Sequence, residues 1–380
     1  MSTGMRYIDD PESLIGGNAV TLLRHGREAF PAWLSAIDEA KTRISLEMYI
    51  FSDDKIGRRF ADALLRAAKR GVTVRLLWDY VGSRLTPESF FRRLRDGGVH
   101  TIAYHRIRFW RPRFWQLWRR DHRKILVCDG RVAFVGGLNI SDEWLDASEG
   151  GGGWHDAAVG IEGPAVAAIE GLFLATWNRR ARKRARLVPE GVGKLPPAGD
   201  TRLAVVANAE LRERFAIRRA GLSAARDADR RIYLANPYFV PDKGIVHALQ
   251  AAARRGIDVR LLLPRVTDAR ILDLASRNVF EPLLRAGVRI WRSTAFIHTK
   301  MLVVDGSFVS LGSYNLDHRS LRYNLEVVVN MLDERFNGAA VGLFDEEMSA
   351  CAELSLADFQ RRSWFDRVLE KLAYALRRWL

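Results

Sequence analysis

The residues best able to do chemistry form one motif that occurs twice in the chain. Each occurrence is a His-x-Lys pair, followed after four residues by Asp and after six more by a Gly-x-x-Asn group. The two sets are His122, Lys124, Asp129, Gly136, Gly137 and Asn139, and His298, Lys300, Asp305, Gly312, Ser313 and Asn315. A match of this length arises by chance at a given position on the order of once in ten million. The repetition therefore predicts a shared function.

These side chains suit the transfer of a phosphodiester. Imidazole is a nucleophile that titrates near neutral pH, so one histidine can attack phosphorus and form a covalent phosphohistidine. The other histidine can protonate the departing alcohol and then deprotonate the incoming one. The two lysines and two asparagines would stabilise the charge that develops on the phosphate oxygens. This chemistry needs no metal or cofactor, and the sequence shows no metal-ligand spacing.

Two carboxylates downstream of the motifs are candidates to orient the histidines. Asp156 lies in GWHDAAVGIEGP and Glu326 in RYNLEVVV, each at the start of an apolar run. A carboxylate usually fixes the tautomer of a catalytic histidine; ordinary strand-edge carboxylates are the alternative. The motif residues Asp129 and Asp305 each precede a glycine, which is also good turn chemistry. A structural role and a supporting catalytic role stay equally open for them, and direct chemistry is disfavoured.

Strands must position these groups. Apolar runs at 125–128 and 132–135, and at 301–304 and 308–311, are joined through Asp-Gly, which predicts two β-hairpins. Residues i and i+2 of a strand share a face. Each His-x-Lys pair would therefore point one way, and each asparagine could return to the same end of its hairpin.

The whole chain repeats itself. RISLEMYIFSDDKIGRRFADALLRAAKRGVTVRLL from Arg43 and RIYLANPYFVPDKGIVHALQAAARRGIDVRLL from Arg231 both predict strand, helix and parallel strand, with Gly71 and Gly256 ending the helices. The expected fold is α/β, with two fused, similar domains related by a pseudo-two-fold axis and mixed sheets flanked by helices. We place them at residues 1–188 and 201–380, with a Pro- and Gly-rich linker at 189–200. Such packing would bring both motifs to one site.

The composition of the chain limits the kinds of partner that it could bind. The net charge of +15 favours nucleic acid or an anionic membrane surface. The N-terminus does not read as a signal peptide, and no stretch of 18 uncharged apolar residues occurs, so we expect a protein that lies on a membrane without spanning it. Two cysteines suit a reducing compartment. Six further histidines lack a matched context and are expected to be surface or packing residues: His25, His100, His105, His155, His247 and His318.

Two segments could contact lipid. Residues 104–120 are dense in Arg and Trp, which predicts an interfacial lip with Trp110, Trp115 and Trp118 in the headgroup layer; a packed helix or a protein interface is the alternative. Residues 364–380 repeat apolar positions at helical spacing among Arg and Lys, which predicts a basic amphipathic helix. That helix could lie on anionic lipid or dock on the enzyme body, and both interpretations stay open here.

The chain resembles the phospholipase D superfamily, and within it the bacterial cardiolipin synthases of the short type without N-terminal transmembrane helices. The resemblance runs from about residue 17 to about residue 365 and includes HRKILVCDGRVAFVGGLN and GSYNLDHRSLRYNLEVVV. It implies that His122 is the nucleophile and His298 the general acid/base. It also implies that Glu326 orients His122 and Asp156 orients His298 across the halves, with phosphate bound by Lys124, Lys300, Asn139, Asn315 and Ser313. Gly137 departs from the serine of the full motif.

The expected activity is the conversion of two phosphatidylglycerol molecules into cardiolipin and glycerol through a phosphohistidine. The alternatives are a phospholipase D hydrolase or transphosphatidylase with another donor, such as phosphatidylethanolamine, or a nuclease of the same superfamily. A non-catalytic membrane-binding protein is disfavoured because both motifs are intact. The expected partner is the anionic lipid surface on the cytoplasmic side of the bacterial inner membrane, with no nucleic acid.

Overall fold

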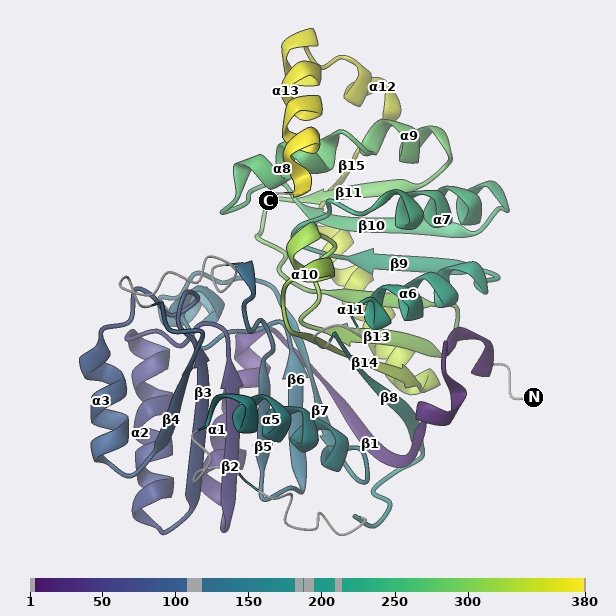
Figure 1. Ribbon diagram of the computed structural model, residues 1–380. Coiled ribbons are helices and arrows are strands. Elements are labelled where there is room, and N and C mark those ends of the chain that lie inside the picture. Colours follow the sequence, from purple (N-terminus) through teal and green to yellow (C-terminus); the bar gives the residue numbers. More distant parts are fainter. Residues whose placement is uncertain (1–3, 108–117, 182–186, 188–194, 209–213, 379–380) are drawn as a thin grey trace.

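Each repeat unit folds as the sequence predicts, into a strand, a helix and a second, parallel strand in the computed structural model (Figure 1). These elements are β2 (Arg43–Met48), α2 (Lys55–Lys69) and β3 (Thr73–Asp79) in the first unit, and β9 (Arg231–Ala235), α7 (Lys243–Arg254) and β10 (Asp258–Pro264) in the second. The structure describes residues 4–107, 118–181, 187, 195–208 and 214–378.

Both crossover helices are defined at their ends by residues of the repeat. The side chains of Asp54 and Asp242 accept hydrogen bonds from first-turn amides of α2 and α7. Beyond the other ends, Gly71 and Gly256 have φ of 91° and 87°, a region that glycine enters without steric cost. The same signals in both halves therefore produce helices in matching positions.

The motif strands form the two predicted hairpins. The paired strands are β5 (Ile125–Cys128) with β6 (Val132–Gly136), and β12 (Met301–Val304) with β13 (Phe308–Gly312). Asp129 and Asp305 in the turns have φ of 55° and 50°, the left-handed region that Asp tolerates better than most residues. Each His-x-Lys pair directly precedes its hairpin, so it lies at the opposite end from the Asp-Gly turn.

In the described part of the chain, one continuous sheet of 15 strands runs through both halves. Its other strands are β1 (Ile15–Arg24), β4 (His100–Tyr104), β7 (Ala157–Glu162), β8 (Thr201–Asn208), β11 (Arg289–Ser293), β14 (Glu326–Leu332) and β15 (Ala352–Glu353). Antiparallel β1 and β8 join the halves. Outward from them the order is β7-β6-β5-β2-β3-β4 on one side and β14-β13-β12-β9-β10-β11 on the other, where β15 is added. This symmetry confirms two similar fused α/β halves.

Helices cover the sheet (Figure 1). Besides α2 and α7 they are α1 (His25–Glu39), α3 (Glu88–Asp96), α5 (Val166–Arg180), α6 (Ala216–Arg226), α8 (Arg270–Arg277), α9 (Phe280–Arg285), α10 (His318–Arg322), α11 (Glu334–Ser349), α12 (Leu356–Gln360) and α13 (Trp364–Ala375). A central apolar cluster draws on both halves, with Val127 and Val135 from one and Val303 and Leu311 from the other. Burial of this shared face holds the two hairpins in a fixed relation.

The segment before β1, which we predict to belong to the first domain (residues 1–188), contacts the second half. Tyr7 and Ile8 pack in the core of that half. The Tyr7 hydroxyl donates a hydrogen bond of 2.6 Å to Asp305. This follows because β1 lies beside β8, which places the segment before β1 against the second half. Residues 189–194 of the predicted linker at 189–200 lie outside the described residues, and its boundaries stay a prediction.

Candidate active site

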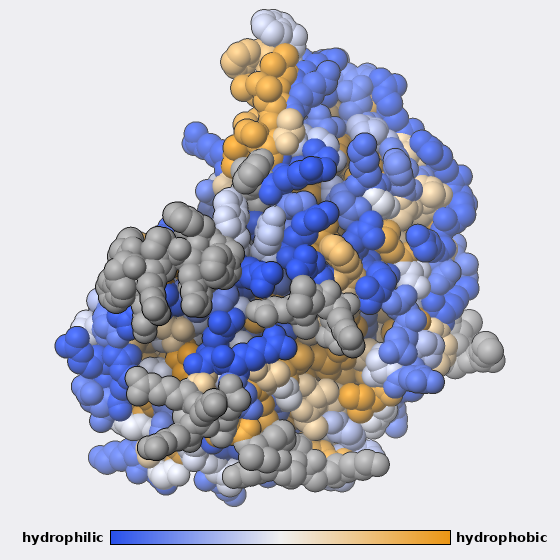
Figure 2. Space-filling model, in the orientation of Figure 1, coloured by the Kyte–Doolittle hydropathy of each residue, from blue (hydrophilic) through white to orange (hydrophobic). Residues whose placement is uncertain are grey.

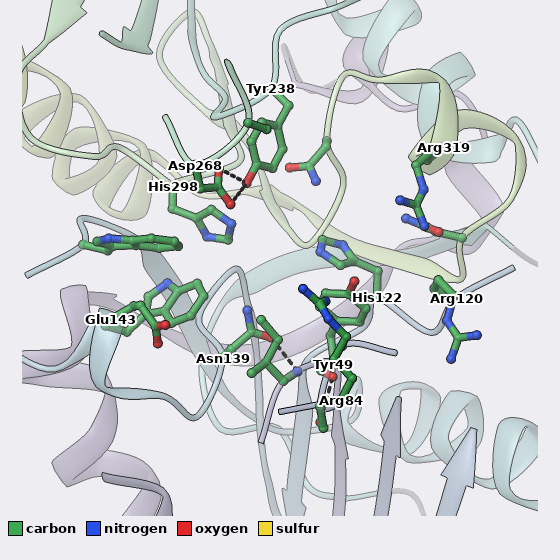
Figure 3. Close-up of a pocket in the computed structure, with 18 of the residues that line it drawn as sticks. Tyr49, Arg84, Arg120, His122, Asn139, Glu143, Tyr238, Asp268, His298 and Arg319 are labelled. Atoms are coloured by element: carbon green, nitrogen blue, oxygen red, sulfur yellow. Dashed lines mark hydrogen bonds between the residues drawn. The ribbon is translucent and has the colours of Figure 1, made fainter. Parts of the chain in front are cut away.

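The two His-x-Lys motifs meet at one cavity between the halves (Figure 3). The cavity has a volume of about 660 Å³. His122 and Asn139 line it from the first half, and His298 and Asn315 line it from the second. The fold therefore brings both motifs to a single place.

His122 is oriented by a carboxylate from the other half of the chain. Its Nδ1 lies 3.0 Å from Oε2 of Glu326, the first residue of β14. Glu326 is fully buried and accepts three further hydrogen bonds, from Ser313 Oγ at 2.5 Å, Ser320 Oγ at 2.7 Å and Asn324 Nδ2 at 3.3 Å. Donors on all sides keep the carboxylate charged and fix its plane. With the proton on Nδ1, Nε2 of His122 keeps a lone pair.

His298 has the reciprocal partner. Its Nδ1 lies 2.6 Å from Oδ2 of Asp156, which directly precedes β7 of the first half. Asp156 is fully buried and accepts hydrogen bonds from the Trp144 indole at 3.0 Å and the Ala157 amide at 2.8 Å. The structure thus shows the crossed pairing that the family resemblance implies. The two hydrogen-bonded pairs also tie the halves together across the cavity.

The motif lysines lie beside the imidazoles. Each ammonium group donates to the backbone oxygen of the histidine two residues earlier, and for Lys124 this distance is 2.7 Å. Lys300 Nζ also lies 3.0 Å from Nε2 of His298 and 3.8 Å from Oδ2 of Asp156. Neither lysine is among the residues that line the cavity, so both ammonium groups lie behind the histidines.

Burial sets the protonation of the site. It lowers the pKa of His122 to about 4 and the pKa of His298 to about 3, against the opposing effect of the neighbouring carboxylates. Burial likewise lowers the pKa of Lys124 to about 7 and that of Lys300 to about 8. Without substrate both imidazoles are therefore neutral at pH 7, which is the form that a nucleophile requires, whereas a general acid must first gain a proton. A bound phosphodiester anion favours the charged form of each lysine.

The motif asparagines add hydrogen-bond donors. Asn139 accepts a hydrogen bond of 3.1 Å from the Ile50 amide through Oδ1, which leaves its NH₂ group for a ligand. Asn315 is buried, and its Oδ1 has no partner among the described residues. An amide held at a cavity wall with spare hydrogen-bonding capacity is suited to bind substrate oxygen.

Ser313 and Gly137 occupy equivalent motif positions but do different things. Ser313 was expected to bind phosphate; instead it is fully buried, and its hydroxyl donates to Glu326. At Gly137 a Cβ atom would lie 2.2 Å from Oδ1 of Asp156. The first half therefore has no room for the serine, and Trp144 supplies the hydrogen bond to the carboxylate instead. The departure from the full motif follows from this close approach.

The motif aspartates lie away from the cavity. Asp129 accepts hydrogen bonds from the amides of Lys41, Thr42 and Arg43 at 2.7–3.0 Å. Asp305 does the same with three amides of residues 229–231, at 2.7–2.9 Å. From Lys124 to Asp129 the chain runs along β5 for roughly 15 Å. These contacts favour the structural role, in which each aspartate ties its hairpin turn to the loop before β2 or β9.

Several cavity residues were not identified from the sequence. Trp144 and Trp154 pack on His298, with ring centroids 5.0 and 5.6 Å away, and Tyr49 packs edge-on against His122 at 4.8 Å. Tyr238 and Asp268 also line the cavity, and the Tyr238 hydroxyl donates a hydrogen bond of 2.8 Å to the Asp268 carboxylate. A tyrosine soon after the first strand of each repeat unit, at 49 and 238, was the available signal. The tryptophans offered none, because long-range packing places them.

Arginines surround the His122 side of the cavity. Arg84, Arg120 and Arg319 line it (Figure 3). Arg120 is 1% exposed and bonds the buried carboxylate of Asp79 with Nε and Nη2 at 2.8–3.0 Å. This pair holds the segment that leads into the first motif. Of the predicted lip, Trp110 and Trp115 lie outside the described residues, and Trp118 is 36% exposed.

The duplicated fold and the crossed histidine pairs at a shared cavity define a phospholipase D-type protein. Residues 33–153 and 222–348 match the family described as "Cardiolipin synthase, PLD-like domain". The chain belongs to this family.

Known relatives agree over most of the chain. It is 32% identical to the major cardiolipin synthase ClsA of Bacillus subtilis over 94% of this chain and 75% of that protein. It is 37% identical to a cardiolipin synthase of Geobacillus thermodenitrificans over 96% and 73% of the two chains. The structure of phosphatidylserine synthase from Haemophilus influenzae shares the fold, with a TM-score of 0.67 at 14% identity over 94% of this chain and 92% of that one.

Proposed function

We propose that this protein is a cardiolipin synthase, which transfers a phosphatidyl group from one phosphatidylglycerol to another and releases glycerol. The observation that carries the proposal is the pair of imidazoles at one cavity, each within hydrogen-bond distance of a carboxylate of the other half. The curated relatives named above support the lipid assignment.

In the first step, Nε2 of His122 attacks phosphorus of the donor lipid. A P–N bond forms while the P–O bond to the glycerol headgroup breaks, and the departing alkoxide takes the Nε2 proton of His298. His298 must therefore be imidazolium before this step, a form that Asp156 and a bound phosphodiester anion favour. Glu326 stabilises the positive charge that His122 gains, as a buried carboxylate beside imidazole does. Lys124 and Lys300 oppose the charge on the phosphate oxygens.

In the second step, His298 takes the proton from a hydroxyl of the acceptor phosphatidylglycerol. The hydroxyl oxygen attacks phosphorus, the P–N bond breaks, and His122 returns to its neutral form with cardiolipin as product. Over the two steps, one phosphodiester bond of the donor is broken and one phosphodiester bond of the product is made. Transfer exceeds hydrolysis when the acceptor is held at high effective concentration beside the phosphohistidine.

We propose that the acceptor and donor are drawn from an anionic membrane on which the protein lies, on the cytoplasmic face of the bacterial inner membrane. Support comes from α13, over which apolar side chains gather at the surface (Figure 2). Its Trp364, Phe365 and Leu372 are 75%, 55% and 58% exposed. Lys371 and neighbouring arginines accompany this stripe. The opposite side of α13 packs on α8. One face of this helix therefore docks on the enzyme body, and the exposed face is the one that we propose binds lipid. Basic amphipathic helices of this kind bind anionic lipid.

The site and the exposed stripe lie near each other in the fold. Ala269, Ile271 and Leu272 of the α8 region line the cavity, and α8 is the helix on which α13 packs. A bilayer in contact with α13 would therefore lie close to the cavity. No helix among the described residues is long and apolar enough to cross a membrane.

Product analysis tests the proposal. The full chain is incubated with phosphatidylglycerol vesicles, and lipids and free glycerol are measured by mass spectrometry, with plasmid nicking in parallel. We expect cardiolipin and glycerol in equal amounts, lost in His122→Ala and kept in the surface control His247→Ala. Phosphatidic acid as the main product would mean a hydrolase. Plasmid cleavage without any lipid product would mean a nuclease and refute the proposal.

A further inference from the structure

A second cluster of possible ligands lies behind the active site. His25, His155 and Glu347 each offer one ligand atom, and these atoms lie within 4.8 Å of one another. His155 Nδ1 is 2.8 Å from the carboxylate of Glu347, and His25 Nε2 is 3.5 Å from Oε1 of the same carboxylate. No local pattern in the sequence indicates this group, because its members come from distant segments and both histidines are expected to be packing or surface residues.

The backbone holds the three side chains in place. The His25 amide donates to the Asp156 carbonyl at 2.8 Å, and the His155 amide donates to the Phe296 carbonyl at 3.1 Å. Glu347 lies in the last turns of α11, a helix of the second half, whereas both histidines belong to the first half. His25 has φ of +55°, an uncommon conformation for a residue with a side chain. The cluster is therefore a fixed feature of the junction between the halves.

We propose that His25, His155 and Glu347 bind one divalent transition-metal ion of the zinc class. Two imidazoles and one carboxylate suit Zn²⁺, whereas Mg²⁺ and Ca²⁺ prefer oxygen ligands alone. Tetrahedral bonds of about 2.0–2.1 Å place ligand atoms about 3.3 Å apart. The two distances to Glu347, 2.8 and 3.5 Å, bracket that value, and the two imidazole nitrogens lie within 4.8 Å of each other. Side-chain shifts would therefore complete the coordination.

Room for a further ligand and a path from solvent are both present. The side chains of His25 and His155 are 19% and 35% exposed, and both line a cavity of about 230 Å³. Asp146 and Glu346 line the same cavity, together with Arg27. Water can therefore complete the coordination, and the two carboxylates offset the positive charge of the ion and of the arginine.

Coordination links this site to the catalytic carboxylate. His155 directly precedes Asp156, and its carbonyl accepts a hydrogen bond of 2.6 Å from the His298 amide. Nδ1 of His25 accepts a weak hydrogen bond of 3.3 Å from the Asp156 amide. Metal on Nε2 of His25 requires the proton on Nδ1, so this bond is lost and the ring must turn slightly. The ion would fasten α11 to the segment that carries Asp156, and thereby one half to the other.

Metal binding without lipid tests the proposal independently of the proposed function. Tag-free, chelator-treated full chain is titrated with Zn²⁺ alone by calorimetry, and thermal unfolding is followed at each concentration. We expect one ion per chain and a midpoint of unfolding that rises with occupancy. His155→Ala should weaken binding by at least about tenfold. His25→Asn should do the same while keeping a residue that tolerates the left-handed conformation.

Two controls separate this site from others. His247→Ala removes an exposed histidine of α7 and should bind Zn²⁺ as the wild type does. His122→Ala with His298→Ala removes the catalytic imidazoles and should also retain the ion. Absence of saturable binding, or binding unchanged in both His155→Ala and His25→Asn, would overturn the proposal.

Discussion

The two imidazoles at the cavity share a motif but not an environment. Glu326, which holds His122, is held in turn by two hydroxyls and an amide. Asp156, which holds His298, is held by an indole and a backbone amide. Around His298 lie Trp144 and Trp154, whereas arginines line the cavity on the side of His122.

The difference shows which parts of a duplicated site can diverge. The hairpin, the His-x-Lys spacing and the turn aspartate are the same in both halves, because they fix where the imidazole lies. The groups that hold the carboxylate differ, because any donor of suitable geometry can fill that role. Two similar halves can therefore assign the nucleophile to one histidine and proton transfer to the other.

Replacement of either histidine should have the largest effect on activity, and the two replacements should differ in how they can be rescued. His122→Ala and His298→Ala should both lower cardiolipin formation by at least about 10⁴-fold. With a donor that carries a p-nitrophenol leaving group, His298→Ala should recover about 100-fold, because this group departs without a proton. His122→Ala should not recover. Release of p-nitrophenol measures both rates, and equal recovery in the two variants would show that the roles are not divided.

The carboxylates come next in expected effect. Glu326→Gln and Asp156→Asn should each lower kcat by about 10³-fold while the protein stays folded, since the amide no longer fixes the tautomer of its histidine. Steady-state kinetics on phosphatidylglycerol, with circular dichroism as the check on folding, measure this. If one variant kept near-normal kcat, the crossed pair in that half would be structural only.

Substitutions at the equivalent motif positions 137 and 313 test whether the groups that hold the two carboxylates are interchangeable. Gly137→Ala places a Cβ 2.2 Å from Asp156, so we expect a loss of about 1–3 kcal/mol in the free energy of unfolding and a fall in kcat. Ser313→Gly removes one donor to Glu326 and should lower kcat by about tenfold. Denaturant unfolding and kinetics measure both changes. A Gly137→Ala protein of normal stability and activity would show that the contact is not restrictive.

The turn aspartates should have the smallest effect on catalysis. Asp129→Asn and Asp305→Asn weaken hydrogen bonds to three backbone amides each, so each should lower the free energy of unfolding by about 1–3 kcal/mol. Activity per folded molecule should stay within about twofold of wild type. A loss comparable to that of Glu326→Gln would instead place the aspartate in the chemistry.

The local signals in the sequence were sufficient for the repeat units and hairpins. Short apolar runs, Asp-Gly turns and the caps at Gly71 and Gly256 act within a few residues, and the structure confirms the elements they predict. Symmetry of the two units also led to the fused α/β fold. The merging of both halves into one sheet through β1 and β8 was not predicted, because strand pairing between distant segments leaves no local pattern.

The site was predicted in its motif residues but not in its surroundings. The partners of His122 and His298 were proposed from resemblance, since they lie 204 and 142 residues away along the chain. The role of Ser313 was misassigned because spacing alone does not tell whether a hydroxyl faces the cavity or the carboxylate behind it. Trp144 and the cluster of His25, His155 and Glu347 depend on packing between halves, which one sequence does not encode locally.

Mapping of the covalent intermediate tests the central claim most directly. His298→Ala is mixed with the p-nitrophenol donor, quenched under alkaline conditions that preserve phosphohistidine, and digested for mass spectrometry. The account predicts a phosphatidyl group on the peptide that contains His122 and none there in His122→Ala. Modification of His298 in the His122→Ala protein, with none on His122 in the His298→Ala protein, would contradict it.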